Sequence, residues 1–317
     1  IIAAQSISEP MTQMVLDSHH RSGGAGSKTS GIDRLKEIFG AKDTGIPTKK
    51  KDSTATMELL PITKYLNDKE KVTEIANHIE MIPLHTFVSS WQIFFEKFGH
   101  PEHTKYKHEK ALIDNFLKKN PLLVPPADLT KWCIRIVLLK EKLIFKHMSL
   151  DTIIHKLRTT FDGIYVVYSV ENASEIVLRI YRQSSAFSKK DKVILSNIED
   201  FRVSILNMIV RGIAGIRAAV VGDEQKTQSY ITPEGAVSTR KVYAISCTGS
   251  NVVGVLQNND IDPDHIQTDN IKEIERIYGI EAARYAIINQ VRLNIGGLNY
   301  RHYALCADEM TYTGTVT

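Results

Sequence analysis

The chain has 317 residues, of which 43% are apolar and 24% are charged, and its formal net charge is +4. This length and apolar content can bury a sizeable core in two or three modules, which excludes a disordered protein. The weak positive charge permits contact with nucleic acid but excludes a strongly basic, dedicated binder. Cys133, Cys247 and Cys306 lie far apart, so we expect neither a disulfide framework nor a zinc ribbon, but a reducing compartment.

The first feature along the chain is a helical face with mixed chemistry. Gln13, Leu16, Asp17 and His20 recur at positions i, i+3, i+4 and i+7. On a helix with 3.6 residues per turn, this spacing places an amide, an apolar group, a carboxylate and an imidazole on one side. A stripe that packs in a core would be apolar throughout, so this face predicts a function instead.

A glycine-rich segment at residues 22–27 follows this helix. Glycine loses the most backbone entropy on ordering, so the segment ends the helix. Its Gly23, Gly24 and Gly26 predict a hinge. Helix signals resume at Ser30, which can cap the amide of Asp33 in a capping-box spacing. The stretch 13–40 therefore predicts two helices that flank a hinge.

Residues 46–128 read as an α-rich module. Gly45, Pro47 and the lysine run 49–51 mark its start. Three helices are predicted by apolar or aromatic residues at helical spacing: one over 72–82, one through Trp91, Phe94, Phe95 and Phe98, and one over 111–119. Pro125 and Pro126 close the module.

The remainder, residues 129–317, predicts a mixed α/β module with a helical C-terminal part. Strands are predicted at 132–138, 164–170 and 176–181, with a helix over 150–157 that Ser149 caps, which gives a β-α-β-β order. A helix over about 193–210 and strands near 216–221 and 241–247 follow. Beyond Gly249 the chain reads as mostly helical, with Thr268 or Asp269 capping a helix over 271–278. The whole chain is therefore predicted to be α+β.

Several motifs resemble one protein family. The run IAAQSISEPMTQM at residues 2–14 resembles the signature that opens the trigger loop in the largest subunit of multisubunit DNA-directed RNA polymerases. The resemblance continues in five further segments: 30–38, 211–216, 279–284, 299–302 and 310–314. Residues 16–21, LDSHHR, resemble the polymerases of cytoplasmic large DNA viruses of poxvirus or asfarvirus type. Ser8, Asp17 and His19 depart from the residues usual in the family.

The resemblance implies an arrangement of modules. Residues 1–45 would form the trigger loop as a helical hairpin with its flanking helices, residues 46–128 a jaw-like module, and residues 129–317 a cleft module. The jaw-like assignment rests on position alone. Because the match starts in the middle of a domain, it also suggests the C-terminal portion of a longer subunit.

The resemblance also implies roles for individual residues. His20 takes the position of the trigger-loop histidine, which approaches the phosphates of the incoming nucleotide. As an imidazolium it would stabilise charge on the leaving pyrophosphate, either electrostatically or by donating a proton. Leu16 would contact the base, while Gln13 and Asp17 would contact the ribose. Arg21 is either a solvated charge or a second phosphate contact, and both interpretations stay open.

No metal site is expected within this chain. The run 258–264, NNDIDPD, superficially resembles the loop whose carboxylates hold magnesium in these polymerases, but Pro263 replaces the glycine that lets the backbone approach the metal. Mg²⁺ would therefore be bound by a part of the subunit that is not in this chain, and the chain would be inactive alone. His100, His103 and His108 are expected in a solvated loop.

The expected partners are those of a polymerase: the remainder of the largest subunit, the second-largest and smaller subunits, DNA template, RNA and ribonucleoside triphosphates, with no membrane. The viral interpretation implies a cytoplasmic viral factory and the virion, and otherwise a nuclear or cytoplasmic location. The main alternative is a non-catalytic polymerase-like module that binds partner subunits or nucleic acid. A more distant one is an independent phosphate-handling enzyme that uses His20 with Asp260, Asp262 and Asp264.

Overall fold

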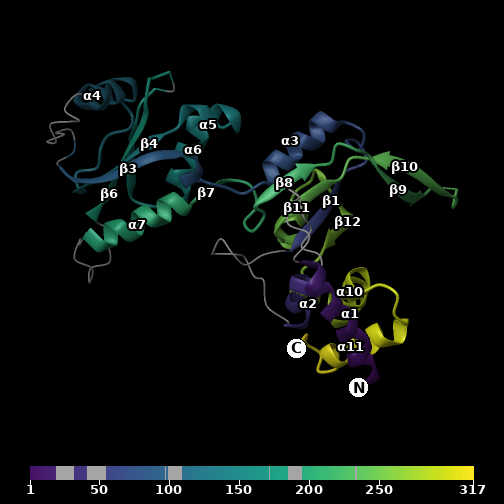
Figure 1. Cartoon of the computed structure of the whole chain (residues 1–317). Helices are drawn as coiled ribbons and strands as arrows, with labels where there is room; N and C mark the ends of the chain where they lie inside the picture. The colour runs from purple at the N-terminus through teal and green to yellow at the C-terminus, as the bar shows by residue number, and fades with distance from the viewer. Residues whose placement is uncertain are drawn as a thin grey trace. The chain divides into compact units, whose positions relative to one another are not determined.

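The computed structural model describes residues 1–18, 32–40, 55–96, 98, 109–170, 172–184, 195–232 and 234–317. Helices and antiparallel sheets both occur, which confirms the predicted α+β class. The chain forms two compact units, one from Ile1–Met81 with Arg211–Thr317 and the other from Ile82–Val210. We call these the first unit and the inserted unit (Figure 1). The predicted jaw-like module, residues 46–128, is divided between the two units. Its assignment as jaw-like, and that of residues 129–317 as a cleft module, stay predictions.

The inserted unit contains a four-stranded antiparallel sheet in the order β3-β4-β6-β5. Its strands are β3 Val88–Phe95, β4 Leu129–Leu138, β5 Ile164–Tyr168 and β6 Ile176–Gln183. Its helices are η1 Leu84–Phe87, α4 Glu109–Lys119, α5 Lys140–Phe145, α6 Leu150–Thr160 and α7 Leu195–Asn207. A short pair, β2 Ile82–Pro83 and β7 Ile209–Arg211, completes the strands near this unit. The predicted β-α-β-β order is confirmed by β4, α6, β5 and β6.

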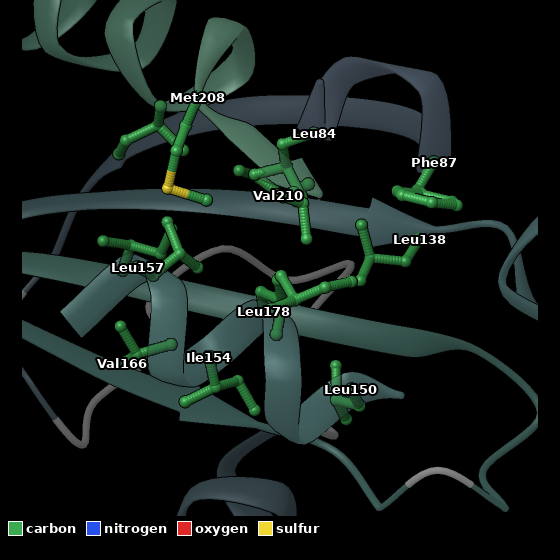
Figure 2. Close-up of a cluster of buried hydrophobic side chains, with 14 of the residues drawn as sticks. Leu84, Phe87, Leu138, Leu150, Ile154, Leu157, Val166, Leu178, Met208 and Val210 are labelled. Carbon is green, nitrogen blue, oxygen red and sulfur yellow. The ribbon is translucent and has the colours of Figure 1, made fainter. Parts of the chain in front are cut away.

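The main core of the inserted unit lies where α6 packs on the sheet. Figure 2 shows Leu150, Ile154 and Leu157 along α6, close to Val166 and Leu178 of the sheet. All five side chains are buried. The predicted cap also holds, since the Ser149 hydroxyl accepts a hydrogen bond from the amide of Thr152 at 3.2 Å. A local cap and an apolar stripe with helical spacing therefore suffice to place α6.

A cluster of buried charges also lies within the inserted unit. The Nε of Arg179 donates to Glu109 at 2.6 Å, and the Nε of Arg135 donates to the other oxygen of Glu109 at 2.8 Å. Arg179 also pairs with Glu96. We call Glu96, Glu109, Arg135 and Arg179 the buried ionic cluster. Its two positive and two negative charges balance, which a buried position requires. Burial raises the pKa of the neighbouring Cys133 to about 12.

One predicted helix of the α-rich module is wrong. Trp91, Phe94 and Phe95 lie in strand β3, which pairs with β4 so that Trp91 faces Ile136 and Phe94 faces Cys133. Aromatic residues favour strands because they pack well on a pleated, half-buried surface, and here that preference overrides the helical spacing. The two other predicted helices are confirmed as α4 and as α3, Lys69–Ile79, which Asp68 caps.

The first unit is built on a second antiparallel sheet in the order β12-β1-β11-β8. Its strands are β1 Thr56–Pro61, β8 Ala218–Val221, β11 Ile245–Thr248 and β12 Ile261–Thr268, and a separate hairpin joins β9 Lys226–Ile231 to β10 Val237–Val242. Helix α3 packs against this sheet, and the short helix α8 Val252–Leu256 follows β11. β8 confirms the strand predicted near 216–221, and the strand predicted over 241–247 is divided between the end of β10 and β11. The expectation of a mostly helical chain beyond Gly249 is wrong at β12, which pairs with β1 far away in sequence.

Two glycines allow close approach of the backbone in the first unit. Gly212 has φ +93°, and a Cβ built there would lie 2.0 Å from the carbonyl oxygen of Glu80. Gly249 has φ +102°, and its Cβ would lie 2.0 Å from the carbonyl oxygen of Gly215. No L side chain fits either contact, which explains on physical grounds why glycine stands at both positions.

Helices complete the first unit at both ends of the chain: α1 Ile2–Ser18, α2 Ile32–Phe39, α9 Ile271–Tyr278, α10 Ile280–Asn294 and α11 Tyr300–Thr311. Figure 1 shows α1 and α2 next to α10 and α11. Asn270 caps α9 through its side chain, whereas Thr268 or Asp269 was expected to do so. No helix in the described part of the chain is long and apolar enough to span a bilayer.

Candidate functional site

Two helices lie on either side of the predicted hinge. Helix α1 includes the positions of Gln13, Leu16 and Asp17. Helix α2 begins at Ile32 on the far side of the hinge. The other predicted site residues, His20, Arg21, Gly23, Gly24 and Gly26, lie outside the described residues. The roles assigned to all of these residues therefore stay predictions, and the structure describes only the helices on either side of them.

Apolar contacts attach both helices to the C-terminal helices. Ile7 of α1 and Leu35 and Ile38 of α2 are buried in one cluster with side chains of α9, α10 and α11. Their buried partners there are Ile271, Ala283, Ile287, Ile288, Val291, Ile295, Tyr303, Ala307 and Met310. Burying one such aliphatic side chain contributes about 1.5–3 kcal/mol, so α1 at Ile7 and α2 at Leu35 and Ile38 are attached to the same helical body.

A buried arginine adds directed hydrogen bonds to this apolar contact. One terminal nitrogen of Arg34, in α2, donates to the side-chain oxygen of Gln290 in α10 at 2.6 Å and to the carbonyl oxygen of Asp269. The other terminal nitrogen pairs with Glu37 at 2.7 Å. Gln290 itself donates to the Asp269 carbonyl at 2.8 Å. We call Arg34, Glu37, Asp269 and Gln290 the Arg34 network.

The network continues into the sheet of the first unit. The amide of Asp269 donates to the carbonyl of Thr56 at 3.0 Å, and the hydroxyl of Thr56 donates to the Asp269 carboxylate. The next residue, Asn270, accepts a hydrogen bond from the amide of Glu273 at 3.3 Å and so caps α9. Asp269 thus lies where β12 ends and α9 begins, held to the start of β1. Arg34 therefore contacts a turn that is held between strand β12 and helix α9.

An open polar pocket of about 710 Å³ lies beside this turn. Its lining carries Lys272 and Arg276 together with Glu273 and Glu275, so its charges balance. Glu273 also has a structural role, because its carboxylate accepts a hydrogen bond from the amide of Val252 at 2.6 Å. The lining therefore favours neither an anion nor a cation by net charge.

The acidic run at residues 258–264 makes local contacts. The carboxylate of Asp262 lies 2.8 Å from Nδ1 of His265, and its other oxygen accepts the amide of Asp264 at 3.1 Å. Asp262 and Asp264 lie within β12, and Asp260 directly precedes it. In the described residues, no three His, Cys, Asp or Glu side chains are grouped as a metal ion would need. These contacts are local and lie at the start of β12. His100, His103 and His108 lie outside the described residues.

Arg284 connects two of the C-terminal helices. Its Nε donates to the carboxylate of Asp308 and so joins α10 to α11. This hydrogen bond raises the pKa of the Arg284 guanidinium. Asn299 caps α11 by accepting the amide of Arg301 at 3.1 Å. The Arg284–Asp308 hydrogen bond therefore joins α10 to α11 at their surface, in addition to their shared core.

Comparison with known proteins assigns the chain to a family. The family model described as RNA polymerase Rpb1, domain 5, matches residues 1–317. The chain belongs to this family. It is also similar to proteins named DNA-directed RNA polymerase RPB1 homolog in African swine fever virus isolates. Identity is 37% for isolates from a South African tick and a Namibian warthog and 36% for one from a Kenyan pig. Each alignment covers the whole chain and 22% of the relative, so the chain spans about a fifth of their length.

The family match and the viral relatives therefore confirm the predicted resemblance to a polymerase largest subunit of large-DNA-virus type. The Arg34 network was missed by sequence reasoning, although one signal was available. Arg34 stands next to Leu35 on the buried side of an amphipathic helix, where a charge requires a partner. Its partners Asp269 and Gln290 are 235 and 256 residues away. No local pattern could identify them.

Proposed function

We propose that this chain is the part of a DNA-directed RNA polymerase largest subunit whose mobile trigger loop closes on the incoming ribonucleoside triphosphate during template-directed RNA synthesis. The observation that carries the proposal is the family match over residues 1–317. The attachment of α1 and α2 to one helical body supports it, because a lid that folds between two helices needs both of its ends fixed.

Within this proposal His20 is the catalytic group. As an imidazolium close to the phosphates, it would stabilise the charge that develops on the leaving pyrophosphate. Leu16 contacts the base, and Gln13 and Asp17 contact the ribose, so that a correct nucleotide is sensed before chemistry proceeds. Arg21 would add a phosphate contact or remain solvated. Gly23, Gly24 and Gly26 would allow the hinge to move between open and closed lids.

Magnesium would be held elsewhere in the subunit. The contacts of Asp262 with His265 and with the amide of Asp264 support this part of the proposal, because they already engage both of its carboxylate oxygens. Under this proposal, the chain alone does not polymerise nucleotides. Its partners would be the remainder of the largest subunit, the second-largest and smaller subunits, DNA template and RNA. The viral relatives favour a cytoplasmic viral factory as the location.

The experiment that tests this function replaces His20 by alanine in the complete polymerase. We expect nucleotide addition at saturating ribonucleoside triphosphate to slow by about 10²-fold or more, with a smaller effect on nucleotide binding. Single-turnover extension of an RNA primer on a DNA template measures both quantities. His19→Ala is the matched control and should keep the wild-type rate. A wild-type rate in His20→Ala would instead favour the alternative, a polymerase-like module that only binds its partners.

A further inference from the structure

We propose that Arg34 is a positioning residue for nucleotide addition, because it fixes the helix that follows the trigger-loop tip. This inference rests on the proposed function and adds a residue to it. The side chain of Arg34 touches neither substrate nor metal in this proposal. It acts through α2, which begins at Ile32, directly after the 19–31 segment.

The geometry singles out Arg34 among the residues of α2. Its side chain is buried, with 7% of the residue exposed, and its contacts reach α10 and the turn between β12 and α9. Gln290, its partner in α10, is also buried at 8% exposure. Both residues bind the same carbonyl oxygen of Asp269, so α2, α10 and the turn meet at one point.

Apolar packing alone would not determine the position of α2 so narrowly. Burial of Leu35 and Ile38 attaches the helix, but hydrophobic attraction has no direction. A guanidinium is a planar fork of donors whose hydrogen bonds require particular directions, so it fixes the rotation and the height of the helix. A buried charge is costly and often adds little net stability. Its benefit here is therefore positional.

Precise placement of α2 matters because the loop continues directly from it. A displacement of about 1 Å at a reacting group can lower a rate about 10²-fold. Arg34 lies two residues, about half a helical turn, after the start of α2, so movement at Arg34 passes into the loop. Loss of the Arg34 guanidinium would then leave the lid able to form but poorly aligned over the nucleotide.

The test uses the complete polymerase with Arg34→Met, which keeps the length and apolar stem of the side chain and removes its donors. We expect the rate constant at saturating ribonucleoside triphosphate to fall about 10-fold, with less change in KM. The ratio of ribonucleotide to deoxynucleotide incorporation should fall as well. A merely structural loss would reduce the fraction of active enzyme, which lowers the amplitude of a single-turnover reaction and leaves its rate constant unchanged.

A second variant keeps the test decisive if Arg34→Met does not assemble. Gln290→Leu removes the partner in α10, and we expect a rate constant about 3–10-fold below wild type. The Arg34→Met and Gln290→Leu effects should be less than additive, because both remove one interaction. Arg284→Met is the matched control, since its guanidinium joins α10 to α11 without touching α2, and it should retain the wild-type rate constant.

The outcomes separate this inference from the function on which it rests. A wild-type rate constant in Gln290→Leu and in Arg34→Met, with a slow His20→Ala, would overturn the positioning role and leave the proposed function standing. A wild-type rate in His20→Ala would overturn the proposed function itself. A slow Arg284→Met would show that any loosening of the helices has this effect, which also contradicts a specific role for Arg34.

Discussion

The buried ionic cluster of the inserted unit makes a quantitative prediction about stability. Glu109 is 2% exposed and accepts hydrogen bonds from both Arg135 and Arg179, which are 4% and 0% exposed. Glu109→Gln keeps the shape of the side chain and removes its charge, so two buried guanidiniums are left with Glu96 as the only buried carboxylate of the cluster. Breaking a buried pair in this way costs about 3–5 kcal/mol.

Urea unfolding followed by tryptophan fluorescence measures this cost selectively. The chain has two tryptophans, Trp91 and Trp132, and both lie in the inserted unit. With a slope of about 1–3 kcal/mol per molar urea, the loss corresponds to a midpoint lower by about 2 M. Glu175→Gln is the matched control, because Glu175 is exposed and lies 3.9 Å from Arg135. Its effect should stay below about 1 kcal/mol.

A double variant tests the cause of the loss. Arg135→Met combined with Glu109→Gln leaves one Arg179–Glu96 pair and restores the charge balance of the cluster. The two substitutions should therefore be non-additive by more than about 1 kcal/mol, with the double variant more stable than the sum predicts. Equal urea midpoints for Glu109→Gln and Glu175→Gln would refute the reasoning. The negative charge of Glu109 would then not stabilise the buried arginines.

Two further predictions concern thiols and the candidate site. Burial raises the pKa of Cys133 and of Cys247 to about 12, so at pH 8 a thiol reagent should label the half-buried Cys306 first, with all three labelled in urea. Equal labelling rates in the native chain would contradict this order. Asp17→Asn in the complete polymerase should move the alkaline fall of the single-turnover rate to lower pH, because the carboxylate is expected to favour the cationic form of His20. An unchanged or higher alkaline midpoint would show that Asp17 does not support that charge.

Local signals predicted the elements whose determinants lie within a few helical turns of one another. The Ser149 cap with the stripe of α6, and the stripe of α3, are each contained in about a dozen residues, and both helices occur as expected. Family motifs predicted more than composition did, because the run at residues 2–14 is long and specific. Charge and hydropathy alone would have left the chain as an α+β protein without a function.

Strand pairing set the limit of the sequence-based prediction. Strand β12 includes residues 261–264 of the acidic run, and its β structure depends on pairing with β1, so that Gln267 faces Glu58 about two hundred residues away. Strand β3 depends in the same way on β4, and the helical spacing of its aromatic residues was coincidental. Secondary structure that is stabilised by distant partners leaves only a weak local pattern.

A charged residue among apolar residues of one element is the signal that would extend sequence-based prediction to long-range contacts. Arg34, Arg135 and Arg179 all stand beside apolar residues in their elements, and in each case the structure supplies acceptors from another part of the chain. The two sets of contacts differ in kind. Arg135 and Arg179 share carboxylates within the inserted unit, so their loss should appear as stability. Arg34 pairs with Glu37 within α2, and its contacts with other elements are to a neutral amide and a backbone carbonyl. These contacts lie beside the segment proposed to close on nucleotide, so their loss should appear in the rate of nucleotide addition.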